Sequence, residues 1–182
     1  SITHPEHLAR ELFTHRGSGT LIRRGEEIHT RRSPDGLDTD QLSELLEASF
    51  GKRLVDDYYD RKDFDRFYVA DSYRAAAIIT SENGLPYLDK FGVTDQAQGE
   101  GLGSSIWMRM KEDYDQLFWR SRVENPINSW YFNEADGTYR QGDWIVFWYG
   151  IEDFEKMREA VERALAFPPT LLDESKPTDE GA

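Results

Sequence analysis

The chain has no cysteine among its 182 residues, which excludes disulfide bonds, thiol nucleophiles and cysteine-ligated metal sites. No apolar run is long enough to cross a bilayer. The first residues, Ser-Ile-Thr-His-Pro, also lack the charged-then-apolar order of a signal sequence. We therefore expect a soluble, cytoplasmic protein.

Basic residues are scarce as well: 22 Lys and Arg stand against 35 Asp and Glu, giving a formal net charge of −13. Nucleic acids and anionic membranes need a dominant basic surface, so we expect neither as a partner. The four histidines all precede residue 30 and show no ligand spacing, so we expect no metal. Any cluster of basic residues in such a chain indicates a local, selective binding site.

The length and an aromatic content of 13% fit a single domain with a substantial core. We expect a connecting segment over residues 1–20, a folded domain over residues 21–167 and a disordered tail over residues 168–182. The tail is rich in proline and acidic residues and has no hydrophobic periodicity. The first residue is not methionine, which fits a piece of a longer polypeptide as well as a processed end.

Hydrophobic spacing predicts both helices and strands. Helices are expected over residues 4–13, 38–50, 102–114, 126–132 and 154–167, and strands over residues 20–28, 67–70, 74–80, 86–94, 116–122 and 144–149. Short polar turns between the middle strands are typical of an antiparallel meander. The predicted class is therefore α/β (α+β), with a mixed, mostly antiparallel central sheet flanked by helices.

A glycine-rich loop, Gln98-Gly-Glu-Gly-Leu-Gly103, lies between an expected strand and an expected helix. Unpaired N–H groups at a helix start attract anions. The spacing is one residue short of the dinucleotide fingerprint, and no lysine follows as in the phosphate loop of NTPases. Two interpretations stay open: a cradle for another phosphate ligand, or an ordinary turn.

Two arginines, Arg120 and Arg122, occupy alternate positions of the strand expected over residues 116–122, so both side chains should point to one face. Guanidinium forks suit carboxylates and phosphates, and a pair of them suggests a small ligand with more than one acid group. The alternative is ordinary surface ion pairing with the abundant acids.

The element order and the Gln-x-x-Gly-x-Gly pattern resemble the GCN5-related N-acetyltransferase fold. Several stretches are more specifically similar to the acetyltransferase domains of N-acetylglutamate synthases, of the kind fused to an N-acetylglutamate kinase domain in bifunctional and vertebrate-type enzymes. These stretches are Ser49–Tyr59, Pro86–Phe91, Gln98–Gly103, Leu117–Arg122, Asn125–Tyr131 and Trp144–Gly150.

The resemblance implies transfer of the acetyl group of acetyl-CoA to the α-amine of L-glutamate, by direct attack in a ternary complex, as a step of arginine biosynthesis. It also implies that residues 1–20 lead from an amino-acid-kinase domain of a longer, homo-oligomeric protein. In a eukaryote the expected location becomes the mitochondrial matrix. The alternative is a catalytically silent ligand-binding or oligomerisation domain of the fused kinase.

The resemblance assigns glutamate binding to Lys52, Tyr87, Arg120, Arg122 and Asn125. It assigns acetyl-CoA binding to Phe91, Val93, Gln98, Gly99, Gly101, Leu102, Gly103 and Ser104. Each has a structural alternative, for example a helix C-terminal cation for Lys52, a core aromatic for Tyr87 and an N-cap for Asn125.

The resemblance assigns catalytic roles to Tyr131, as the general acid near the CoA sulfur, and to Asn125. A tyrosine pKa near ~10 against a thiol pKa near ~8.5 makes the proton transfer uphill by about 2 kcal/mol, a gap that nearby arginines could lower. Strand alternation puts Tyr87, Asp89 and Phe91 on one face and Leu88 and Lys90 on the other. Asp89 is then a candidate general base, with a paired acid as the alternative and a water or backbone relay as a substitute.

Overall fold

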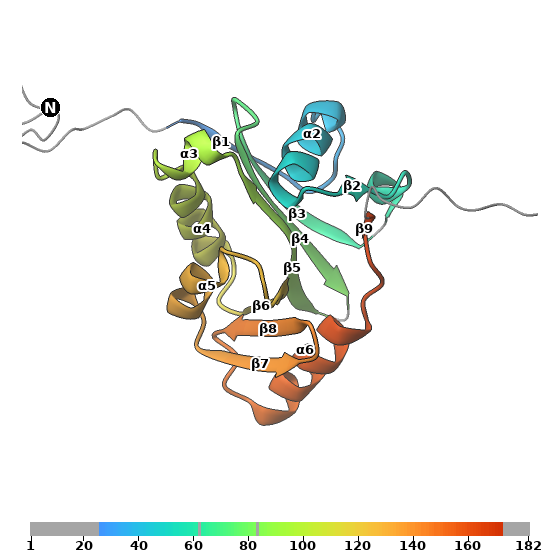
Figure 1. Cartoon of the computed structure of the whole chain (residues 1–182), viewed down its shortest axis with the longest axis vertical. Coiled ribbons are helices and arrows are strands. Elements are labelled where there is room, and N and C mark those ends of the chain that lie inside the picture. Colours follow the sequence, from blue (N-terminus) through green and yellow to red (C-terminus); the bar gives the residue numbers. More distant parts are fainter. Residues whose placement is uncertain (1–25, 62, 83, 173–182) are drawn as a thin grey trace, which may run out of the picture.

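A computed structural model describes residues 26–61, 63–82 and 84–172 and has a central sheet with the strand order β1-β3-β4-β5-β6-β8-β7 (Figure 1). Its strands are β1 (Ile28–Arg31), β3 (Phe64–Ala70), β4 (Ala75–Glu82), β5 (Leu85–Val93), β6 (Leu117–Arg122), β7 (Gly137–Gln141) and β8 (Trp144–Tyr149). Only the β5–β6 pair is parallel. The predicted fold class is confirmed.

Helices cover both faces of the sheet (Figure 1). On one face α4 (Leu102–Asp113) packs its Trp107 ring against Trp119 of β6, with α5 (Asn128–Glu134) beside it. On the other face lie α2 (Thr39–Phe50) and α6 (Phe154–Ala166). Asp38 caps α2 by accepting a hydrogen bond from the Gln41 backbone, and the helix buries a leucine stripe. None of the described helices is long and apolar enough to span a membrane.

The sheet splays at its centre. The strands β5 and β6 pair only at Tyr87 with Phe118 and at Leu88 with Trp119, although β5 continues to Val93 and β6 to Arg122. Beyond Leu88, the edge of β5 that faces β6 therefore has no strand partner among the described residues. This separation makes room for a cleft in the middle of the molecule.

A β-bulge interrupts β5 at Asp89. In the pairing with β4, Ile79 faces Leu88 but Ile78 faces Lys90, so Asp89 is an extra residue on its strand. The bulge turns Lys90 to the side of Ile78 and α2, while Phe91 returns to the side of Leu88 and contacts the Trp107 ring at 5.8 Å. The prediction that Tyr87, Asp89 and Phe91 share one face is therefore wrong for Phe91.

Several element boundaries differ from the predictions. The fourth expected helix begins at Asn128 rather than Pro126, because residues 126–127 form a turn. The first strand of the described chain, β1, starts at Ile28, where the predicted strand ends. Edge strand β7 was not predicted. The expected helix over residues 4–13 and the expected connecting segment over residues 1–20 lie outside the described residues.

The segment after α6 is folded up to residue 172. Strand β9 (Leu171–Leu172) pairs antiparallel with β2 (Arg53–Leu54), which directly follows α2 and Lys52 (Figure 1). The prediction of a disordered tail is therefore wrong for residues 168–172. The rest of that predicted tail lies outside the described residues.

Candidate active site

Two adjoining cavities open at the splay between β5 and β6. One has a volume of about 340 Å³ and the other about 540 Å³. Both are lined by Ser49, Phe50, Phe91, Asn125, Pro126 and Tyr131. We call the first the cationic cavity, because Lys52, Lys90, Arg120 and Arg122 line it, and the second the loop cavity, because Gln98, Gly103 and Ser104 line it. Together they form a cleft with two chemically different compartments.

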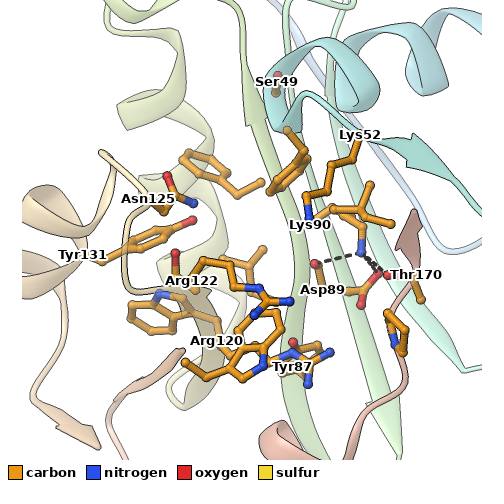
Figure 2. Close-up of a pocket in the computed structure, with 18 of the residues that line it drawn as sticks. Ser49, Lys52, Tyr87, Asp89, Lys90, Arg120, Arg122, Asn125, Tyr131 and Thr170 are labelled. Atoms are coloured by element: carbon orange, nitrogen blue, oxygen red, sulfur yellow. Dashed lines mark hydrogen bonds and ion pairs between the residues drawn. The ribbon is translucent and has the colours of Figure 1, made fainter. Parts of the chain in front are cut away.

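The cationic cavity collects side chains from distant parts of the chain (Figure 2). All the residues predicted to bind glutamate line it, namely Lys52, Tyr87, Arg120, Arg122 and Asn125. Against its four cations stand two acids, Asp89 and Glu124. This compartment therefore suits a small anion with more than one negative group.

The two arginines lie on one side of β6, as strand alternation predicts. Each guanidinium carbon lies over the Trp144 ring, at 4.3 Å for Arg120 and 4.1 Å for Arg122. Arg120 donates to the backbone oxygens of Ala164 (2.7 Å) and Pro168 (3.3 Å). Arg122 lies 3.6 Å from Asp143, whose side chain is 84% exposed. These contacts orient Arg120 through neutral carbonyl groups and leave its charge available to a ligand.

Asp89 and Lys90 form a buried ion pair at the bulge. Lys90 Nζ lies 2.9 Å from Asp89 Oδ2, which also accepts from Tyr58 (2.6 Å) and Arg61 (3.3 Å). Burial opposes ionisation of Asp89, but Lys90, Arg61 and Tyr58 outweigh it and lower the pKa of the carboxyl group. Burial lowers the pKa of Lys90 against the attraction of Asp89. A carboxylate that accepts three hydrogen bonds and has a lowered pKa is poorly suited to remove a proton. This favours the interpretation of Asp89 as a paired acid.

Tyr131 stands where the two cavities meet and is only 6% exposed. Aromatic rings surround it, including Trp119 at 5.4 Å and Phe147 at 5.5 Å. Burial raises its pKa, and Tyr87 raises it further. The expectation that arginines lower this pKa is wrong, so the hydroxyl group stays protonated well into alkaline pH.

Asn125 lies in the turn between β6 and α5 and lines both cavities; Figure 2 shows it in the cationic cavity, near Tyr131. Its side-chain oxygen accepts from the Ile127 backbone at 3.3 Å, whereas the N-cap position of α5 is Ile127 itself. The N-cap interpretation of Asn125 is therefore wrong. Tyr87 is 4% exposed, and its ring lies at a tilt against Phe118 (5.0 Å between centroids) and Phe167 (4.5 Å), so it combines a core contact with a cavity position.

The glycine loop joins the short helix α3 (Asp95–Gln98) to α4. Gly99 ends α3, and Gly101 has a left-handed φ of 77° before α4 begins at Leu102. At Gly103 a Cβ atom would lie 3.0 Å from a methyl group of Val93, so the helix approaches β5 closely there. Of the residues predicted to bind acetyl-CoA, Phe91, Val93, Gln98, Gly103 and Ser104 line the loop cavity, whereas Gly99, Gly101 and Leu102 do not. Gly99 and Gly101 set the path of the loop between the two helices, and Leu102 anchors it because its side chain is buried.

Sequence reasoning missed several residues of the cationic cavity, among them the polar residues Lys90, Ser121 and Thr170. Lys90 was predicted to face away because the bulge was not foreseen. The Ser121 hydroxyl is buried and has no hydrogen-bond partner among the described residues. Thr170 belongs to the segment predicted to be disordered, and only the β2–β9 pairing reveals it. Within the described residues, no group of three His, Cys, Asp or Glu side chains could hold a metal.

The chain is similar in sequence to known proteins from bacteria and vertebrates. An acetylglutamate kinase from Xanthomonas campestris pv. campestris is 51% identical over 177 residues, covering 94% of this chain and 42% of that protein. Human mitochondrial N-acetylglutamate synthase is 45% identical over 175 residues, covering 93% of this chain and 33% of that protein. The chain thus spans well under half the length of these relatives.

A solved structure of a putative acetyltransferase of the GNAT family from Bacteroides thetaiotaomicron matches with a TM-score of 0.57 and 17% identity, covering 76% of this chain and 95% of that one. This likeness concerns the fold alone. A family model described as the N-acetyltransferase of N-acetylglutamate synthase matches residues 29–166. The chain therefore belongs to the family of N-acetyltransferase domains of N-acetylglutamate synthases.

Proposed function

We propose that this chain transfers the acetyl group of acetyl-CoA to the α-amine of L-glutamate, forming N-acetyl-L-glutamate and CoA. The observation that carries the proposal is the pair of cavities that meet at Tyr131, one lined by four cations and the other by the glycine loop. Family membership supports the same reaction, since relatives carry the name N-acetylglutamate synthase.

In this proposal glutamate occupies the cationic cavity. Its two carboxylates match the charges of Lys52, Arg120 and Arg122, each charged hydrogen bond contributing about 1.5–3 kcal/mol. Tyr87 and Asn125 complete the wall with neutral polar groups. An aspartate substrate would be one methylene shorter and would reach fewer of these groups, so we expect the cavity to prefer glutamate.

Acetyl-CoA occupies the loop cavity, with its pyrophosphate against the glycine loop and the start of α4. Free N–H groups and the positive end of the helix dipole suit phosphate oxygens there. The thioester then reaches the splay, where the open edge of β5 near Phe91 and Val93 can donate a backbone N–H to the developing oxyanion.

The reaction proceeds by direct attack of the amine on the thioester within the ternary complex. The cysteine-free chain offers no thiol for an acetyl-enzyme. Tyr131, held protonated by its surroundings, donates to the departing thiolate. Because Asp89 is fully engaged, we assign removal of the ammonium proton to a water or a backbone carbonyl rather than to this carboxylate.

Free-thiol release tests the proposal. The purified chain contributes no thiol of its own, so a thiol reagent reports CoA directly. We expect release that requires both acetyl-CoA and L-glutamate and that falls strongly with L-glutamine, which has lost one carboxylate. Release no faster than the spontaneous hydrolysis of acetyl-CoA would instead support a silent binding or oligomerisation domain.

A further inference from the structure

The last described residues close one side of the cationic cavity. We call residues 168–172 the C-terminal strap. The strap leaves α6, passes beside Lys90 of β5 and pairs with β2, and its Pro169, Thr170 and Leu171 line the cavity (Figures 1 and 2). The Val55 backbone donates to the carbonyl oxygen of Thr170 at 3.2 Å and fixes this part of the strap.

Thr170 holds the buried ammonium group of Lys90. Lys90 Nζ donates to Thr170 Oγ1 at 2.7 Å, and it also donates to the side chain (2.9 Å) and backbone oxygen (3.2 Å) of Asp89 (Figure 2). An ammonium group has three donors, so these three acceptors define its direction. Two of them come from the neighbouring residue, and the strap supplies the third.

The same stretch of chain orients other residues of the cavity. Arg120 donates to the Pro168 carbonyl, the Phe167 ring lies 4.5 Å from the Tyr87 ring, and β9 pairs with the strand that follows Lys52. Thr170 and Pro168 offer neutral oxygens, unlike a carboxylate partner. They therefore help to orient Lys90 and Arg120 without adding a negative charge to the cavity.

We propose that the C-terminal strap is a positioning element of the amino-acid site, with Thr170 as the positioning residue for Lys90. The strap fixes the positions of Lys90 and Arg120 in the wall of the space where the carboxylates of the substrate bind. The inference rests on the proposed function, because it names which segment sets the affinity for glutamate.

Paired substitutions at Thr170 test the inference. Thr170→Val keeps the shape but removes the hydroxyl group, and we expect a roughly tenfold rise in KM for glutamate, with kcat and KM for acetyl-CoA within about twofold of the parent. Thr170→Ser retains the hydroxyl group and should restore the parental value. Thr138→Val, at an exposed position of β7, is the matched control.

Calorimetric titration with L-glutamate in the presence of CoA gives a second reading that needs no turnover. A parent that binds glutamate without releasing thiol would refute the proposed reaction, while weaker binding by Thr170→Val alone would still support the strap. Equal glutamate affinity for the Val and Ser variants, an equal rise in both KM values, or a parent that binds no glutamate would overturn the inference.

Discussion

The guanidinium carbon of Arg122 lies 4.1 Å from the centre of the Trp144 ring, and the same ring lies 4.3 Å from that of Arg120. A single indole on β8 therefore contacts both cations of the strand beside it. Trp144 also lines the cationic cavity. The ring attracts the guanidinium groups without neutralising them, so it aligns the pair for an anion.

Trp144→Leu should weaken glutamate binding without changing the formal charge of the site. A cation–π contact contributes on the order of 1 kcal/mol, so the loss of two predicts a rise of about 5- to 30-fold in KM for glutamate. Steady-state kinetics with each substrate varied in turn would measure it. Trp144→Phe, which keeps an aromatic face, should recover most of the affinity, and a Phe variant as weak as the Leu variant would refute the ring's role.

Arg120→Ala and Arg122→Ala should each raise KM for glutamate about 10-fold or more, because each removes a charged hydrogen bond of about 1.5–3 kcal/mol. KM for acetyl-CoA should change far less. Arg109→Ala, which removes an exposed arginine paired with Glu112 on α4, provides the control. Equal rises in both KM values would contradict the assignment of these arginines to the carboxylates.

Tyr131→Phe should chiefly lower turnover. A positioned acid contributes about 100-fold or more, so kcat should fall by roughly that factor while both KM values stay close to the parental ones. Since its surroundings raise the pKa of Tyr131, parental kcat should also show no loss from its ionisation up to about pH 9. Parental kcat in the Phe variant at saturating substrates would remove Tyr131 from the mechanism.

The glycine loop can be tested with two glycines that have nearly identical φ angles. Gly101 has a φ of +77° and Gly36 a φ of +78°, and an added Cβ would meet nothing within 4 Å at either position. An alanine at either should therefore cost about 1–2 kcal/mol of stability through backbone strain alone. Only Gly101→Ala should also weaken CoA binding in a calorimetric titration. A similar loss of CoA affinity in Gly36→Ala would point to general destabilisation.

Asp89→Asn should destabilise the fold by about 3–5 kcal/mol at pH 7, because Lys90 then stays buried without its charge partner. The pKa of Asp89 is lowered in the folded state, so its stabilisation is fully present above the pKa of the unfolded chain and is lost as pH falls through the folded value. The penalty measured by urea unfolding should be equal at pH 7 and pH 5 and smaller below about pH 4. A penalty that is independent of pH would indicate a packing effect instead.

Local patterns were sufficient for much of the fold. The leucine stripe and the Asp38 cap predicted α2, and the apolar run at Trp144 predicted β8 to the residue. The predicted glutamate-binding residues also line a common cavity. These features depend on short-range periodicity or on side-chain type, both of which are legible in a single sequence.

Features that depend on partners distant in the sequence could not be predicted from the sequence. At the bulge, Tyr58 and Arg61 from another part of the chain hold the carboxylate of the extra residue Asp89, and nothing in residues 86–94 signals this arrangement. Composition suggested that the chain after Phe167 is disordered, yet Leu171 finds a strand partner in Leu54. Lys90 and Thr170 were missed for these two reasons.

The pairing of Leu54 with Leu171 also makes the two compartments depend on different lengths of chain. Every residue that lines the loop cavity lies between Ser49 and Asn133. The cationic cavity also needs Pro169, Thr170 and Leu171, which follow α6. Translation therefore completes the residues of the proposed coenzyme compartment before it reaches the last residues of the compartment proposed for the acetyl acceptor.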